Sequence, residues 1–401
     1  MRPLASLLLA CLLPAMISAQ DLTPSAPPGP KAKSWYDSFS IRGYAHLRYN
    51  RLLETNDLLR CQACDASWGR GGGIFLRRAR VIISGQVHPR VYLYMQTDFA
   101  QGVAPNVQNI AQIRDWYMDI GLDPTNEFRV RLGQSKVPYG FENLQSSSER
   151  LPMDRADPTN SGTPNERDLG AFLYWSPKKY RGLFKELKEA GMKGTGDYGI
   201  VGIGAYNGQS ANRAEANDDL NVVARISVPM RIGSQIIEPG VQAYTGRYTV
   251  TADQRSGAKG NSNWTYDDQR VAGTLVLYPK PFGFLAEYNV GKGPEYDVAT
   301  DSISTKDLSG GFVTATYKLI VKDQMFMPFA RYQVYDGGKK NETDARSYSV
   351  NDMEFGVEWL PFKNFELTVE YYLGDRRFED HGLQSNKQKG ELLRIQAQFN
   401  F

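Results

Sequence analysis

The sequence predicts an all-β protein, a transmembrane antiparallel β-barrel of about 16 strands with a long third external loop folded into the lumen. Three observations predict it. Short segments with an apolar residue at every second position recur along the chain, the first residues form a secretory signal peptide, and the last strand ends on Phe401. After the signal peptide, no run approaches the ~20 apolar residues that a membrane helix needs.

The N-terminal region predicts export. Residues 1–19 have one early charge, an apolar run and a small-residue end at Ala19, as in a signal peptide. Residues 20–37, rich in proline and serine, are expected to be an exposed periplasmic leader. Residues 38–401 show no linker and are expected to form a single barrel domain in the bacterial outer membrane. With 47 Lys and Arg against 44 Asp and Glu, the chain is nearly neutral, and we expect no nucleic-acid partner.

The strand predictions follow from side-chain alternation. In residues 128–132, Phe128, Val130 and Leu132 fall on one face of a strand and Arg129 and Arg131 on the other. Backbone groups in hydrocarbon must all be paired, so such a sheet has to close on itself. Connections alternate between short ones (residues 88–90, 279–281 and 361–364) and long ones (53–73, 249–267 and 373–390), as outer-membrane barrels require. Residues 177–197 break this rule and predict a short surface helix.

The final strand alternates up to an aromatic end. Leu393, Ile395, Ala397, Phe399 and Phe401 share one face, with polar residues between them. This pattern resembles the C-terminal strand signature of outer-membrane barrels. The alternative is an edge strand of a soluble β-sandwich.

Arginines occupy the polar phase of many predicted strands: Arg42, Arg48, Arg78, Arg80, Arg129, Arg131, Arg225, Arg270, Arg331 and Arg394. A guanidinium stays charged and offers a planar fork of donors that fits phosphate oxygens, and rings of such groups select anions in pores. We expect the early members Arg78, Arg80, Arg129 and Arg131 to be free to meet an anion. The alternative is that lumen arginines pair with carboxylates and brace the wall. Late carboxylates are expected to neutralise Arg331 and Arg394: Glu287, Glu354, Glu358, Glu366 and Glu370.

Aromatic residues near strand ends predict interface girdles. Those on the outward phase are Trp116, Trp175, Tyr278, Trp359 and Tyr371. Tyr44, Tyr92, Tyr94 and Tyr117 fall on the polar phase, which leaves a sugar channel open as an alternative.

Cys61 and Cys64 lie in the first external loop, where an oxidising compartment favours a small disulfide ring. The three histidines are scattered, no further zinc ligands lie near the cysteines, and no nucleotide-binding loop is complete. We therefore expect no enzyme activity, no metal and no cofactor.

Residues 133–142, followed by Glu149 and Arg150, resemble the phosphate-selective porin O and P family, and residues 204–208 and 286–288 are similar to later segments of that family. The resemblance covers essentially the whole mature chain. It implies a homotrimeric 16-stranded channel whose arginines form a ladder and whose third external loop holds the anion site. Carried over, Arg150, Ser146 and Ser147 match the loop residues. The loop has one lysine, Lys136, where the best-known members have a cluster, which favours general anion preference over strict phosphate selectivity.

These observations together predict a passive outer-membrane porin for phosphate, polyphosphate or other small anions, surrounded by outer-membrane lipid. The expected anion-binding residues are Arg78, Arg80, Arg129, Arg131, Lys136, Ser146, Ser147, Arg150, Arg225 and Arg270. The alternatives are a general diffusion porin with structural arginines and a non-conducting barrel that serves as an adhesin or receptor.

Overall fold

The computed structural model describes residues 34–59, 73–101, 110–163, 165 and 167–401. The chain divides into two units, residues 1–37 and 38–401. In the first unit, a 3-10 turn, η1 (Trp35–Ser38), begins where the backbone N–H of Ser34 donates to Oδ2 of Asp37 at 2.7 Å. The predicted signal peptide, most of the predicted leader and the predicted Cys61–Cys64 disulfide lie outside the described residues.

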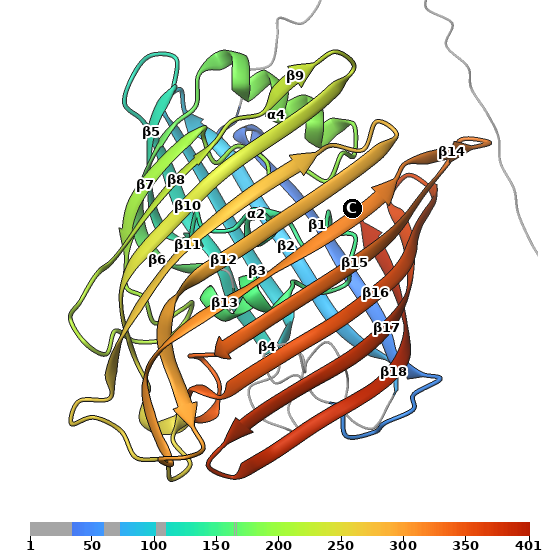
Figure 1. Ribbon diagram of the computed structural model, residues 1–401. Helices are drawn as coiled ribbons and strands as arrows, with labels where there is room; N and C mark the ends of the chain where they lie inside the picture. Colours follow the sequence, from blue (N-terminus) through green and yellow to red (C-terminus); the bar gives the residue numbers. More distant parts are fainter. Residues whose placement is uncertain (1–33, 60–72, 102–109, 164, 166) are drawn as a thin grey trace, which may run out of the picture. The chain divides into compact units, whose positions relative to one another are not determined.

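The second unit is a closed antiparallel barrel, which confirms the predicted fold class (Figure 1). Within the described residues the strands are β1 (Phe39–Leu52), β2 (Phe75–His88), β3 (Val91–Gln101), β4 (Ile110–Gly121), β5 (Phe128–Lys136), β6 (Arg167–Trp175), β7 (Val201–Tyr206), β8 (Asn221–Ser227), β9 (Met230–Ile232), β10 (Gln235–Thr249), β11 (Thr265–Leu277), β12 (Phe282–Asp297), β13 (Ser302–Tyr317), β14 (Leu319–Val321), β15 (Gln324–Gly338), β16 (Ser347–Phe362), β17 (Phe365–Asp380) and β18 (Leu383–Asn400). The helices are α2 (Phe141–Leu144), α3 (Asp157–Gly162), α4 (Lys178–Glu189), η3 (Ala252–Gln254) and η4 (Thr343–Ala345).

Each strand pairs with its neighbours in sequence, and β1 pairs with β18 to close the sheet. The three-residue strands β9 and β14 continue the lines of β8 and β13 and pair with β10 and β15, so the wall has 16 positions. At the closing seam, the N–H of Gly43 donates to the carbonyl of Phe401 at 2.9 Å, and the N–H of Phe401 donates back at 3.0 Å. Closure leaves no edge strand whose backbone groups would face lipid.

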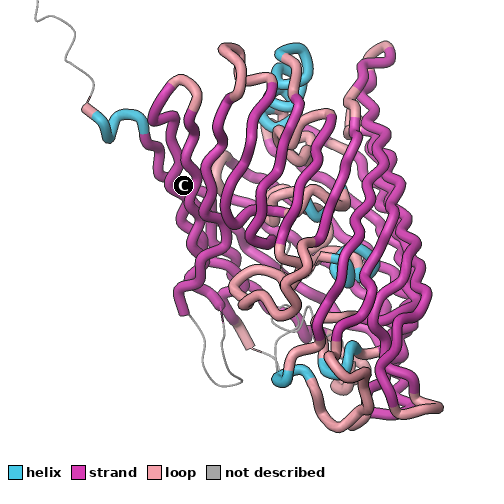
Figure 2. The backbone as a smooth tube through the Cα atoms, turned by 90° about the vertical axis from the view of Figure 1, so that its left-hand side faces the viewer, coloured by secondary structure: helices cyan, strands magenta, loops and turns pink. Residues whose placement is uncertain are grey.

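The two ends of the barrel differ. Short connections such as residues 89–90 and 279–281 lie at one end, with α4, β9 and β14 (upper part of Figure 1), and we call it the short-turn end. The predicted long loop at residues 373–390 is wrong, because β17 and β18 continue to a tight turn at His381 and Gly382. Figure 2 shows that strands make up the wall, with short helices and loops between them. None of the described helices is long and apolar enough to cross a membrane.

Side chains alternate across the wall as the sequence predicts. In β11, Val271 and Leu275 are 48% and 46% exposed, whereas Arg270, Ala272 and Thr274, on the alternate positions, are 2%, 1% and 6% exposed. The outward phase is apolar, as contact with lipid requires, and the polar phase is buried inside the barrel.

The close approach at the seam gives a test of stability. A Cβ on Gly43 would lie 2.3 Å from the carbonyl oxygen of Arg80 and 2.4 Å from the ring of Phe401, whereas a Cβ on Gly273 would meet no atom within 4 Å. We expect Gly43→Ala to lower the free energy of unfolding by about 1–3 kcal/mol through overpacking. The matched Gly273→Ala should change it by less than about 0.5 kcal/mol. Urea unfolding of both variants in lipid vesicles, followed by tryptophan fluorescence, measures the difference; equal effects would contradict the seam contact.

A second test concerns the turns opposite the short-turn end. Nδ1 of His381 lies 2.8 Å from Oδ1 of Asp301, and this hydrogen bond and the carboxylate charge raise the pKa of His381 above 6.5. Because the pKa of His381 is raised in the folded protein, the ion pair contributes its full stabilisation at pH values below the ordinary pKa of histidine. This contribution is lost as the pH rises through the folded-state pKa. Asp301→Asn should return the pKa of His381 towards 6.5, as measured by NMR titration of the imidazole. Asp297→Asn, which removes a carboxylate paired with Lys306 instead, is the control.

Candidate functional site: a basic column inside the wall

The inner faces of β1 and β2 carry a column of basic side chains. Strand register places Tyr44 opposite Arg80 and His46 opposite Arg78, with Arg42 on one side of these pairs and Arg48 on the other. Residues two apart in a strand are about 6.6 Å apart, so the wall presents an arginine at nearly every level. These side chains face inward because the side chains of both strands alternate with a period of two, which puts these residues on the buried face.

A β-bulge adds a member that the sequence analysis missed. The pairing of β1 with β2 shifts between His46 and Leu47, which leaves Arg77 without an opposite residue. An extra residue of this kind re-aims its side chain. Arg77 accordingly lies beside Arg78, and its guanidinium is 3.9 Å from Oδ1 of Asp154. No alternation in the sequence indicates two successive inward arginines.

Residues 137–163, between β5 and β6, contact strands around the barrel, and we call them the inner segment. The buried partners include Tyr44, which shares a 2.7 Å hydrogen bond with Ser147, and Arg270, which donates to Oγ of Ser161 at 2.7 Å. The partners come from β1, β2, β10, β11, β12, β15, β17 and β18. Side chains of eight strands therefore hold the inner segment.

Asp154 is the main carboxylate of the inner segment. It forms ion pairs with Arg48 at 3.0 Å, with Arg77 at 3.9 Å and with Arg394. Arg394 is also paired with Glu370 at 2.7 Å. One carboxylate is therefore shared by three guanidinium groups from β1, β2 and β18.

The expectation that the early arginines are free of carboxylates is wrong for Arg80, Arg129 and Arg131. Nε of Arg80 lies 2.7 Å from Oδ2 of Asp98. The ion-pair distances are 2.8 Å from Arg129 to Asp197 and 2.7 Å from Arg131 to Asp119. A buried charge costs several kcal/mol unless it is paired, so these carboxylates stabilise the wall.

Two further predicted site residues are also engaged. Arg225 pairs with Glu238 at 3.3 Å, and Arg270 lies 3.8 Å from Asp268 in addition to its bond with Ser161. For these two arginines, the geometry supports the alternative role, in which an arginine pairs with a carboxylate and braces the wall.

Arg78 differs from these arginines. It is 5% exposed, and its Nη1 lies 3.3 Å from Nδ1 of His46. Among the residues that the structure describes, it forms no ion pair with a carboxylate, and its Nε has no hydrogen-bond partner. Its charged neighbours include Arg77, Arg80 and Arg150, with Asp154 as the opposing charge. Because an arginine only donates, Nδ1 of His46 accepts, and the imidazole is neutral.

The predicted site residues of the inner segment, together with Lys136 at the end of β5, divide into two groups. Ser147 lies in the column, where its hydroxyl contacts Tyr44 and accepts from Arg80 at 3.1 Å, and Arg150 is buried near Arg78. Ser146 shares a 2.8 Å hydrogen bond with Ser148. Nζ of Lys136 donates to the carbonyls of Asn143 and Gln145 at 2.9 and 2.5 Å, and therefore holds the end of α2.

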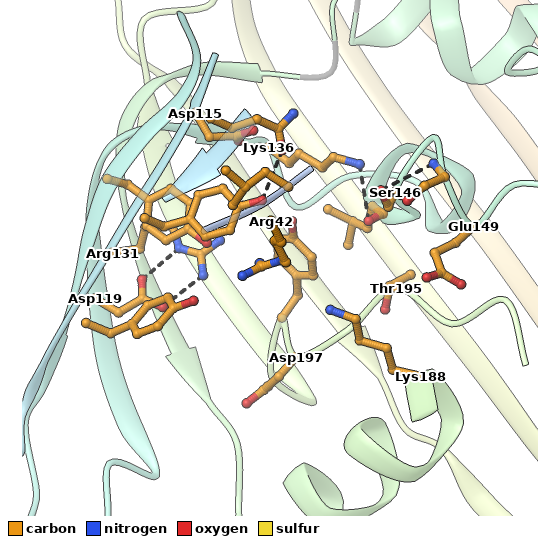
Figure 3. A pocket seen from close by; sticks show the side chains of 18 of the residues that line it. Arg42, Asp115, Asp119, Arg131, Lys136, Ser146, Glu149, Lys188, Thr195 and Asp197 are labelled. Atoms are coloured by element: carbon orange, nitrogen blue, oxygen red, sulfur yellow. Dashed lines mark hydrogen bonds and ion pairs between the residues drawn. The ribbon is translucent and has the colours of Figure 1, made fainter. Parts of the chain in front are cut away.

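On the short-turn side of Ser146, a cavity of about 640 Å³ opens (Figure 3). Its wall includes a row in which the rings of Tyr94 and Tyr117 stack with centroids 5.0 Å apart. Cζ of Arg131 lies 3.8 Å from the centroid of Tyr117, and Cζ of Arg42 lies 5.7 Å from that of Tyr94. Arg42 comes from β1 and Arg131 from β5, so guanidinium groups from two strands lie near the stacked pair.

Basic side chains outnumber carboxylates by eight to four in the lining of this cavity, and three of them, Arg129, Arg131 and Arg167, pair with carboxylates. Burial alone would raise the pKa of Asp197, but Arg129 and hydrogen bonds from the N–H of Gly199 and the hydroxyl of Ser176 lower it. Arg42 donates to Oγ of Ser84 at 2.8 Å and, within the described parts of the chain, has no carboxylate partner.

The expected late ion pairs are confirmed in part. Arg331 pairs with Glu354 at 2.5 Å, and Arg394 pairs with Glu370. Glu287 instead accepts from Thr159 at 2.7 Å and from the backbone of Phe141 at 2.8 Å.

One aromatic prediction is wrong. Trp116 and Trp175 are 56% and 38% exposed on the outward phase, as expected, but Tyr278 is 1% exposed and donates to Glu238 at 2.5 Å. It follows β11 rather than lying within it, so the alternation of that strand does not fix its direction.

The contrast between Arg42 and Arg131 gives a test. Arg131→Gln removes a two-pronged ion pair with Asp119 and should lower the free energy of unfolding by about 3 kcal/mol. Arg42→Gln should change it by less than about 0.5 kcal/mol and should reduce chloride conductance in planar bilayers, because Arg42 faces the cavity. Urea unfolding and single-channel current measure the two effects. Equal destabilisation by both substitutions would show that Arg42 is a bracing residue.

Comparison with known proteins places this geometry among channels. The sequence model described as phosphate-selective porin O and P matches residues 55–401. Solved structures with the same fold include the outer membrane channel DcaP of Acinetobacter baumannii, with a TM-score of 0.55 and 16% identity over 90% of this chain and 97% of that chain. OmpF of Salmonella typhi in complex with daunomycin has a TM-score of 0.55 and 13% identity over 90% and 97% of the two chains. OmpT of Vibrio cholerae has a TM-score of 0.52 and 12% identity over the same shares. No curated protein matches the sequence.

Proposed function

The chain belongs to the phosphate-selective porin O and P family, and we propose that this outer-membrane porin is a passive channel that prefers anions, phosphate and polyphosphate among them. In this proposal the inner segment folds into the lumen and narrows it beside the basic column of β1 and β2. The family resemblance also supports a homotrimer as the working form.

Arg78 is the observation that carries the proposal. A buried guanidinium with three arginine neighbours and no carboxylate ion pair among the described residues is costly unless a counter-charge meets it. An anion that accepts from Arg78 would supply the missing charge through charge-assisted hydrogen bonds. Ser147 and Arg150 of the inner segment lie beside the same group and would add donors.

The column also meets the kinetic requirement of a channel. Conduction needs several moderate sites rather than one tight site, so that an ion can leave. Arg42, Arg80, Arg78 and Arg48 succeed one another along the wall, and the nearby carboxylates Asp98 and Asp154 weaken the attraction at two of these levels. An anion would therefore pass between unequal sites.

A general diffusion porin is the second candidate. The ion pairs of Arg80, Arg129, Arg131 and Arg225 favour it, because paired arginines brace the wall and leave little net field.

Planar-bilayer recording separates the candidates. An anion porin should give a reversal potential that favours chloride in a potassium chloride gradient, and millimolar phosphate should block the chloride current. Arg78→Gln should weaken this block by about tenfold or more, the loss expected for a charge-assisted hydrogen bond of about 1.5–3 kcal/mol. Arg150→Ala should weaken it in the same direction.

The control is Arg247→Gln, an arginine that is 55% exposed and paired with Asp219. It should leave the block unchanged. Weak selectivity with no phosphate block in the wild type would favour the general diffusion porin, and the absence of any stable current would favour a non-conducting barrel. Heat-modifiable migration on gels confirms that each variant is folded.

A further inference from the structure

The connection between β6 and β7 is an exception among those of the short-turn end. It contains α4 and buries apolar side chains of that helix, so the predicted surface helix is only partly exposed. Leu187 is 1% exposed and Met192, just after the helix, is 8% exposed. Both belong to a cluster with Phe141 of the inner segment and Tyr278. The connection therefore packs against the segment that we propose to narrow the channel.

Lys193 follows in a conformation that is uncommon for a residue with a side chain, with a φ of 61°. The side chain is 8% exposed, and its Nζ lies 2.5 and 2.8 Å from the two carboxylate oxygens of Glu358 on β16. The carbonyl of Lys193 accepts from Nε2 of Gln145 in the inner segment at 2.5 Å. Lys193, at the short-turn end, thus joins β16 to the inner segment.

Negative charge predominates around Lys193. Its acidic neighbours are Glu358 and Glu366, on the inner faces of β16 and β17, and Glu149 of the inner segment, and Lys318 is a basic neighbour. Burial would lower the pKa of Lys193, but these three carboxylates outweigh burial and raise it. Glu149 borders the cavity near Lys188 of α4 (Figure 3). Without the ammonium of Lys193, the inner face of β16 and β17 would therefore repel anions at this level.

We propose that Lys193 is a specificity-determining residue, an ammonium that the β6–β7 connection inserts into the barrel to cancel the carboxylates of β16 and β17. The inference deepens the proposed function and depends on it for the direction of preference. The basic column of β1 and β2 attracts anions from one side, and Lys193 prevents the opposite wall from cancelling that attraction.

Lys193→Met tests the proposal through the reversal potential of the full-length porin in a potassium chloride gradient. The ratio of chloride to potassium permeability should fall by about sevenfold, because one unit charge about 7 Å from the ion path changes the statistical weight of each ion by about 2.7-fold in water, in opposite directions for chloride and potassium. Lys193→Arg keeps the charge and should preserve the ratio. Lys185→Met is the matched control, because Lys185 lies on the exposed face of α4 and pairs with Glu189 at 3.8 Å.

Glu358→Gln supplies a second, independent test, since it leaves Lys193 in place and should raise the permeability ratio. The double variant Lys193→Met with Glu358→Gln should return the ratio towards the wild-type value. An unchanged ratio in Lys193→Met, or a double variant no different from Lys193→Met alone, would overturn the electrostatic role and leave Lys193 as a packing residue.

The outcome is distinguishable from failure of the proposed function. A wild-type channel without anion preference would refute the proposed function. The shift towards potassium in Lys193→Met, measured relative to that wild type, would still support the inference, and no shift would refute it.

Discussion

The need to pair every backbone polar group in hydrocarbon governs this structure. The sheet closes between β1 and β18, and closure leaves each strand with one face in lipid and one inside. The interior consequently receives every second side chain of the wall, which in this sequence includes many arginines. All later features, from the ion pairs to the inner segment, follow from how those charges are accommodated.

The interior arginines are not neutralised to the same extent all around the barrel. Most interior arginines have a carboxylate within ion-pair distance, and these pairs make the wall stable without producing much net field. The β1–β2 region is different, because Asp154 is shared by three arginines while Arg78 has a neutral imidazole as its hydrogen-bond partner. In the proposed anion channel, selectivity would come from the small excess of positive charge that remains after extensive neutralisation, rather than from the sum of the arginines.

The sequence was sufficient for the architecture and for the side on which each strand residue lies. Period two is a local property, so Arg78 and Arg129 could be placed inside from their neighbours alone. Their partners could not be identified, because Asp119 and Asp197 approach Arg129 from a neighbouring strand and a distant connection whose positions depend on register. The family resemblance supplied Arg150 and Ser147 but gave no information on pairing.

Other residues whose positions the sequence did not predict also have physical explanations. The bulge at Arg77 interrupts the alternation on which strand predictions depend. Tyr278 lies beyond the end of its strand, and Lys193 lies in a connection, where no period fixes direction. Helical spacing in the connection did indicate α4, but not which of its neighbours the apolar face contacts.

Asp154 has a consequence for assembly. Its carboxylate binds Arg48 of the first strand and Arg394 of the last. The inner segment therefore connects the two strands that meet at the seam. Asp154 can bind both arginines at once only when β1 and β18 are adjacent and the loop is in place. Completion of the cylinder and seating of the loop therefore reinforce each other, and a barrel that closed around a misplaced loop would lack the carboxylate that Arg48 and Arg394 share.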